Sequence, residues 1–176
     1  MHTYSHAIFT WAAARLTYRA AARAALWGAA GAALPDIPTL VKAANLLWGR
    51  RASMTKDEFL GAMEYFEEPS GRADLSLHSL VPEGALLGLY KVLGLEKMDS
   101  DKALLSFLVG WAGHNAVDFL THSKDARPIL WPLSQWRWMS PISYWDRECY
   151  AVPAMLVEHG VLLALAMSLL YESYKG

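Results

Sequence analysis

The chain has 176 residues, of which 54% are apolar and eight are tryptophan. This length suits a single domain with its own core, and the composition lies at the hydrophobic edge of what globular proteins use. The formal net charge is −1 and the basic residues are spread along the chain, which excludes the electrostatic footprint of a nucleic-acid-binding protein. We therefore expect one domain over residues 1–176 and no nucleic-acid partner.

The first 50 residues predict two helices joined by a proline turn. Residues 5–33 are rich in alanine and carry arginines at four-residue spacing, so we expect one long helix there. It should stop in the segment Leu34-Pro35-Asp36-Ile37-Pro38, because two prolines spaced by three cannot continue it. Asp36 is thereby expected at a fixed turn, and a short helix over residues 39–48 follows.

Capping signals predict three more helices in the middle of the chain. Thr55 with Glu58 three residues later forms a capping-box pattern for a helix to residue 66, followed by a loop over residues 67–71. Another helix should start near Pro82 and end near Gly94. The next should begin after Asp101 and continue to about residue 122.

The C-terminal part holds a Trp/Pro-rich loop and a long apolar segment. The loop covers residues 123–146, and we expect it to act as a lid or as a belt at a membrane interface. Residues 152–171 are long enough to span a bilayer, with Glu158 and His159 as their only ionisable residues before Tyr171. Such groups inside a span mark a functional site or a polar cavity, although a buried bundle helix explains the pattern as well.

No segment shows sustained period-two alternation, whereas apolar segments recur at helical spacing between Gly, Pro and charged residues. We therefore expect an all-α protein, a helical bundle of about five to six helices with the loop near residues 123–146. A bundle of this kind allows side chains from several helices to converge on one interior point. By hydropathy alone, both membrane association and a cytoplasmic location are open.

Three potential metal ligands lie four residues apart inside an apolar segment. On a helix, His114, Asp118 and His122 form one stripe, and these polar groups need partners if they are buried. A helix rise of about 6 Å lets the first two share an ion, whereas His114 and His122 are about 12 Å apart and cannot. His122 would need a second ion bridged by Asp118, or would cap the helix end.

Imidazole and carboxylate groups suit zinc first, with manganese or iron as alternatives. The candidate ligands are His6, Asp36, His78, His114, Asp118 and His122. If the site is catalytic, Glu158 or Asp146 is the candidate general base. The alternative is a non-catalytic helical membrane or scaffold protein in which the same residues form a buried hydrogen-bond network.

Short motifs around these residues follow one another in an order that is similar to that of a known family. They are Tyr4-Ser5-His6-Ala7, Leu34-Pro35-Asp36-Ile37, His78-Ser79-Leu80, His114-Asn115-Ala116-Val117-Asp118-Phe119-Leu120-Thr121 and Ile129-Leu130-Trp131-Pro132-Leu133. Over residues 1–146 the chain resembles the predicted membrane-bound metal-dependent hydrolases and is more remotely similar to zinc-dependent phospholipase C. The resemblance implies a helical protein of the bacterial inner membrane that hydrolyses a phosphoester or a membrane lipid at a metal site.

Two positions depart from the pattern of that family. Ala73 stands where the family usually has a second histidine, and Pro38 replaces the second acidic residue of the Pro-Asp-x-Asp turn. These departures imply a one-metal site, substitution by Asp74, or loss of activity.

Overall fold

A computed structural model describes residues 1–17, 22–50, 55 and 69–175. Within these residues seven stretches are α-helical and three are short 3-10 helices. They are α1 (Thr3–Thr17), α2 (Ala22–Ala33), η1 (Leu34–Asp36), α3 (Ile37–Arg50), α5 (Pro69–Leu77), α6 (Leu80–Val92), η2 (Leu95–Lys97), α7 (Ala103–Thr121), η3 (Arg147–Cys149) and α8 (Ala151–Lys175). The described residues contain no strand, which confirms the all-α bundle, and residues 123–146 form the predicted loop.

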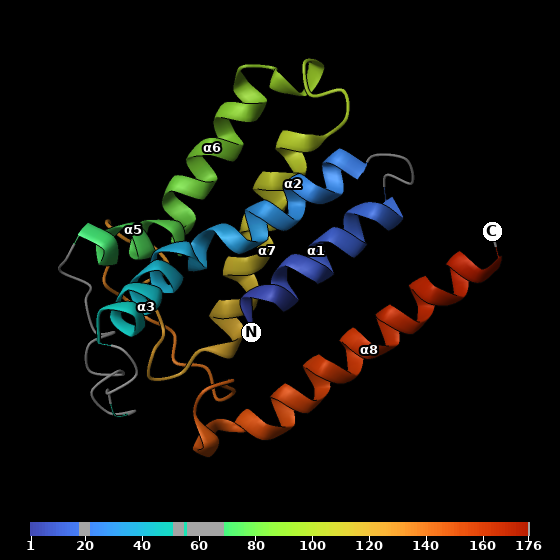
Figure 1. The fold of residues 1–176 in the computed structure, drawn as a ribbon. Helices are drawn as coiled ribbons and strands as arrows, with labels where there is room; N and C mark the ends of the chain where they lie inside the picture. The colour runs from blue at the N-terminus through green and yellow to red at the C-terminus, as the bar shows by residue number, and fades with distance from the viewer. Residues whose placement is uncertain (18–21, 51–54, 56–68, 176) are drawn as a thin grey trace.

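The single helix predicted over residues 5–33 is two helices. α1 ends at Thr17, α2 begins at Ala22, and the two run side by side in opposite directions (Figure 1). The apolar pattern is continuous across both, so it does not reveal where the chain reverses. Folding back lets the small side chains of the two helices pack closely, and Ala24 and Ala25 become fully buried.

The proline turn ends α2 as predicted but introduces no loop. η1 leads directly into α3, and the Ile37 N–H donates to the Leu34 carbonyl. Pro35 and Pro38 occupy the first turns of η1 and α3, where a missing N–H costs no helical hydrogen bond. Asp36 therefore sits at a continuous helical joint, in a fixed position.

Later boundaries follow the sequence with small shifts. α7 begins after Asp101 as predicted, whereas α6 begins at Leu80 because the Ser79 hydroxyl caps it and accepts from the Val81 N–H at 3.1 Å. The loop expected over residues 67–71 is wrong at its end, since Pro69 starts α5, a position that proline favours. The helix predicted from Thr55 to residue 66 lies outside the described residues, apart from Thr55 itself.

Glycines allow α2 and α7 to meet backbone to backbone. A Cβ at Gly31 would lie 2.0 Å from the Phe107 carbonyl oxygen, and one at Gly110 would lie 2.2 Å from the Gly28 carbonyl oxygen. Only glycine fits at such a crossing. The contact brings His114, one turn beyond Gly110, to the end of α2, where its Nδ1 lies 2.7 Å from the Ala32 carbonyl oxygen.

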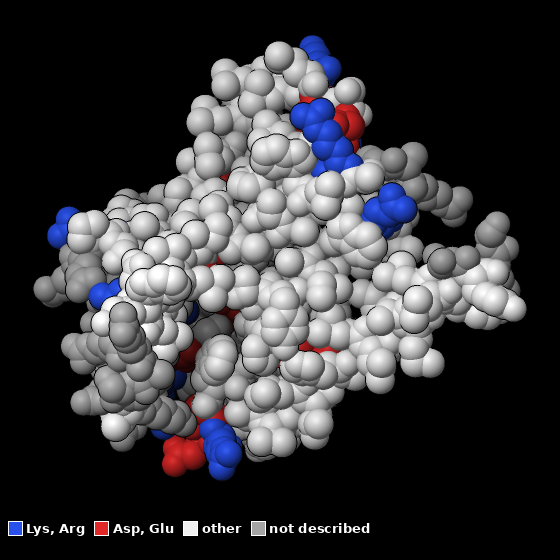
Figure 2. All heavy atoms as spheres, in the orientation of Figure 1, with Lys and Arg blue, Asp and Glu red and all other residues white. Residues whose placement is uncertain are grey.

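Three described segments are long and apolar enough to cross a membrane, namely Ala22–Gly49, Ala103–Thr121 and Ala151–Tyr171. Only 6% of the apolar window in the last segment is buried, and α8 lies beside α1 at the edge of the bundle (Figure 1). Figure 2 shows that Lys and Arg side chains on this face lie mostly toward the margins, that some charged atoms are visible in the hollow between the helices, and that uncharged residues run along α8. An exposed apolar helix of this length is typical of contact with lipid.

Gly110→Ala should destabilise the chain, because the added methyl group would meet the Gly28 carbonyl oxygen. In a helix alanine is favoured over glycine by about 1 kcal/mol. A net loss of stability in this variant would therefore mean that the steric clash at the crossing outweighs the gain in helix propensity. We expect overpacking to cost about 1–3 kcal/mol, measured as a lower Tm of the full chain in detergent.

Gly113→Ala is the matched control on the same helix, since nothing beyond its own turn of backbone lies within 4 Å of a Cβ there. Its Tm should stay the same or rise. Equal losses for the two variants would contradict the close contact between α2 and α7.

Candidate metal centre

Four of the six predicted metal ligands come together at one point of the bundle. They are Asp36 from η1, His78 between α5 and α6, and His114 and Asp118 from α7. One ligand atom from each lies within 4.8 Å of the corresponding atoms of the other three. The four side chains are mostly buried, with Asp36 the most exposed at 17%.

The ligand atoms of this cluster face a common centre. His114 Nε2 lies 3.2 Å from Asp118 Oδ2 and 3.8 Å from Asp36 Oδ1. His78 Nε2 lies 3.7 Å from Asp36 Oδ1 and 3.8 Å from Asp118 Oδ2. The two Nε2 atoms are 3.3 Å apart.

Backbone carbonyls fix the orientation of both imidazoles. His114 Nδ1 lies 2.7 Å from the Ala32 carbonyl oxygen, and His78 Nδ1 lies 2.9 Å from that of Asp74. A carbonyl oxygen only accepts, so each Nδ1 carries the proton and donates it. In the neutral ring each Nε2 then presents a lone pair to the cluster centre.

α7 also positions His78 through hydrogen bonds to the residue before it. The Trp111 indole N–H and the Asn115 amide both donate to the Leu77 carbonyl, immediately before His78. The same Asn115 amide donates to Glu83 Oε2 at 2.8 Å, which ties α7 to α6. Burial lowers the pKa of His78, and the charge of Arg127 lowers it further, so the neutral ring is favoured.

His6 and His122 lie outside this cluster and contact it through Asp118. His6 Nε2 lies 3.0 Å from Asp118 Oδ1, and its ring stacks on that of His114 with the centroids 4.0 Å apart. Burial lowers the pKa of His6, so its neutral ring donates to the carboxylate. The Met1 amino group also lies 3.3 Å from Asp118 Oδ1.

His122 lies between two carboxylates at the end of α7. Its Nε2 is 3.2 Å from Asp118 Oδ2, and its Nδ1 is 2.6 Å from Asp125 Oδ2. Burial opposes the charged form, but the hydrogen bonds to Asp118 and Asp125 raise the pKa of His122 to about 9. The imidazolium has no lone pair to offer a second ion, so the geometry favours the role of an outer partner of Asp118.

Asp74 does not replace a missing ligand. Its carboxylate accepts from Arg127 Nε at 2.7 Å, from Arg127 Nη2 at 3.3 Å and from the Thr39 hydroxyl at 2.8 Å. Burial opposes its ionisation, but Arg127 lowers the pKa of Asp74. Ala73 is exposed on α5, so this departure from the resembled family lies at the surface, away from the buried cluster.

The two predicted base residues are held elsewhere by other partners. Glu158 on α8 is buried, and it accepts from the His2 backbone N–H at 3.0 Å and contacts His2 Nδ1 at 2.9 Å. Asp146 caps η3 and pairs with Lys124 at 2.9 Å. The structure does not bring either residue into the cluster of four.

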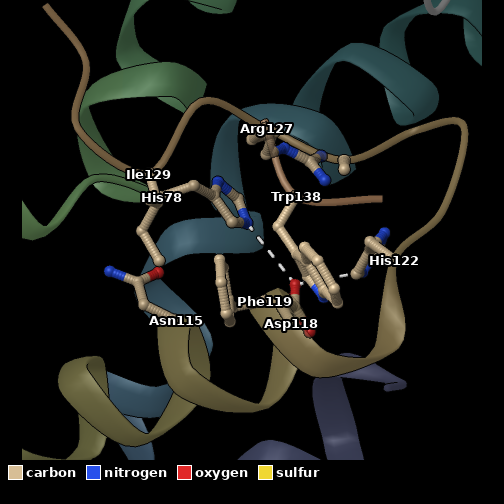
Figure 3. Close-up of a pocket in the computed structure, with 9 residues that line it drawn as sticks. His78, Asn115, Asp118, Phe119, His122, Arg127, Ile129 and Trp138 are labelled. Carbon is tan, nitrogen blue, oxygen red and sulfur yellow. Dashed lines mark ion pairs between the residues drawn. The ribbon is translucent and has the colours of Figure 1, made fainter. Parts of the chain in front are cut away.

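A pocket opens beside the cluster. Its polar side is formed by His78, Asp118, His122 and Arg127, and its apolar side includes Phe119 and Trp138. Figure 3 shows Asp118 between His78 and His122, with Arg127 and Trp138 at the same opening. Sequence reasoning missed Arg127 and Asp125, and the one available signal for Asp125 is that it follows His122 by three residues, just beyond the end of α7.

The bundle, its exposed apolar helices and the buried His/Asp cluster define a helical membrane protein with a polar centre. A family model described as YdjM inner membrane protein matches residues 1–175, and the chain belongs to this family. No curated protein and no solved structure matches the chain. The family and the three apolar helices confirm the predicted membrane association.

Arg127→Gln should destabilise the chain more than the double variant Asp74→Asn/Arg127→Gln. The single change leaves the buried Asp74 carboxylate without its partner, which costs about 3–5 kcal/mol. The double change removes both charges and leaves two amides that can pair. Thermal unfolding in detergent measures the difference, with the exposed Arg147→Gln as a control that should melt like the native chain. Identical melting of the single and double variants would contradict this role of the pair.

Proposed function

We propose that this inner-membrane protein binds a divalent metal ion, zinc first, through Asp36, His78, His114 and Asp118. We further propose that it is a hydrolase of a phosphoester or lipid-like substrate. The observation that carries the proposal is the set of four hydrogen-bond acceptors that face one another inside the bundle. Manganese and iron are the alternative ions.

The dimensions of the cluster fit a tetrahedral ion. Zinc bonds to imidazole nitrogen and carboxylate oxygen are about 2.0–2.1 Å long, which places neighbouring ligand atoms about 3.3–3.4 Å apart. Five of the six separations between the ligand atoms of the cluster run from 3.2 to 3.8 Å, and all six lie within 4.8 Å. Small rotations of the side chains would close the remaining difference.

Charge and hydrogen bonding support the same proposal. When both rings are neutral with their protons on Nδ1, the two Nε2 atoms and the two carboxylates offer only acceptors at the centre. A buried group of acceptors is costly unless a cation or added protons lie between them. A divalent ion would balance the two carboxylate charges without protonating either ring.

Catalysis at this site requires a coordination position beyond the four protein ligands. Four ligands complete a tetrahedron, but zinc can expand to five, and the pocket opens on His78 and Asp118. A metal bound there would lower the pKa of a coordinated water and polarise a phosphoryl oxygen. Glu158 and Asp146 stay the predicted bases, and either would have to leave its present partner to take the proton.

The second candidate function is a non-catalytic membrane protein in which the cluster is a buried hydrogen-bond network. The contacts of Asp118 favour it, because its carboxylate already meets His6, His114 and His122. In that case protons, rather than a metal, lie between the acceptors. Metal content separates the two candidates, since a proton network needs no ion.

The full chain, purified in detergent without a histidine tag or chelator, should bind about one zinc ion per chain. His114→Ala and Asp118→Ala should lose it, because each removes a ligand. His6→Asn should weaken binding about 10–100-fold, the usual effect of losing an outer partner. Elemental analysis and competition with a chelating dye measure these changes.

His159→Ala is the control, since His159 is exposed and bonds to Tyr4 and to the Met155 carbonyl. It should retain the zinc of the native chain. A folded native chain that takes up no divalent ion would overturn the metal site and leave the hydrogen-bond network.

Zinc-loaded protein should hydrolyse a phosphodiester or a phospholipid presented in mixed micelles, and the chelated protein should not. Asp118→Asn should fall to the rate of the chelated protein, because it removes a ligand while preserving shape. Product release is the measurement, with His159→Ala again as the control. A loaded native chain without activity on either substrate class would contradict the hydrolase proposal and leave a structural metal.

A further inference from the structure

Arg127, the arginine of the pocket, has N–H donors that the hydrogen bonds among the described residues do not use. Arg127 donates to Asp74 through Nε and Nη2. A guanidinium has five N–H donors, so the bonds recorded among the described residues use two of them. The side chain is 16% exposed and lines the pocket together with the cluster residues His78 and Asp118.

Asp74 holds this guanidinium in a fixed orientation next to the cluster. The carboxylate makes a forked contact with Arg127, and Thr39 donates to the same carboxylate. The backbone carbonyl of Asp74 also accepts from His78 Nδ1. Asp74 therefore orients both Arg127, through its carboxylate, and the proposed ligand His78, through its backbone carbonyl.

Fixed arginines of this kind recognise phosphoryl and carboxylate groups, because the planar fork matches two oxygens at once. His122 lies on the same polar side of the pocket, with its ring nitrogens facing Asp118 and Asp125. Apolar residues form the other wall. Phe119 and Trp138 stack with their ring centroids 6.2 Å apart, and Trp138 belongs to the Trp/Pro-rich loop.

We infer that Arg127 is a substrate-binding residue that donates to the oxygens of a phosphoryl group, while the apolar part of the ligand lies against Phe119 and Trp138. This inference rests on the proposed function and names the group that the pocket recognises. One phosphoryl oxygen would face the cluster while a second oxygen of the same group accepts from Arg127. These two contacts would hold the ligand in one orientation. The inference needs no covalent step.

Binding of inorganic phosphate to the zinc-loaded full chain, measured by calorimetry in detergent, tests it. Native protein should bind phosphate, and Arg127→Lys should bind it at least about tenfold more weakly, as expected for losing a charge-assisted hydrogen bond. Zinc should still bind at about one ion per chain, because lysine keeps the positive charge and the change removes no proposed ligand. Arg147→Lys, an exposed arginine outside the pocket, should bind phosphate like the native chain.

If Arg127→Lys does not fold, the double variant Asp74→Asn/Arg127→Gln provides the same test, because it removes the guanidinium without leaving a buried charge. It should bind zinc and fail to bind phosphate. Unchanged phosphate affinity in either variant would overturn the inference while leaving the metal site intact. Absence of zinc in the native chain would instead overturn the proposed function, and with it this inference.

Two phosphoryl sources are separated by repeating the titration with phosphatidic acid in nanodiscs and with glycerol phosphate in solution. Tighter binding of the lipid, weakened by Trp138→Ala, would assign the apolar wall to an acyl-bearing ligand. Equal affinities that also depend on Arg127 would assign the pocket to a soluble phosphoryl compound. Failure of both ligands to bind zinc-loaded protein would overturn the inference.

Discussion

The close contact between α2 and α7 sets the position of everything at the polar centre. Gly31 and Gly110 let two backbones touch, and any larger side chain would hold them apart. Because of that contact, the carbonyl at the end of α2 reaches the His114 ring, and η1 places Asp36 opposite it. A small shift between these two helices would separate ligands that belong to different elements.

The backbone then determines the chemistry of the two central histidines. Each ring donates its Nδ1 proton to a carbonyl, so in the neutral ring the other nitrogen is an acceptor that faces a neighbouring carboxylate. Outer residues reinforce this arrangement: His6 and His122 hold Asp118, and Asp74 holds Arg127 and His78. The same fold that places these acceptors together also requires a cation or added protons between them.

Much of the fold followed from the sequence, because helical spacing and proline positions are local signals. The sequence predicts that His6 converges with Asp36, His78, His114 and Asp118; the last four lie together, whereas His6 contacts the cluster only through Asp118 and the His114 ring. The reversal between α1 and α2 was missed, since the alanine-rich pattern continues through both helices. Arg127 was missed because its partner Asp74 lies far away in sequence, and no spacing rule predicts a pair formed by tertiary packing.

X-ray absorption spectroscopy at the zinc edge of the loaded full chain tests the central claim most directly. The account predicts a first shell of two imidazole nitrogens and carboxylate oxygens at about 2.0–2.1 Å, with the imidazole signal reduced in His78→Ala. A first shell of oxygen without imidazole scattering, or a folded chain that retains no zinc, would contradict it.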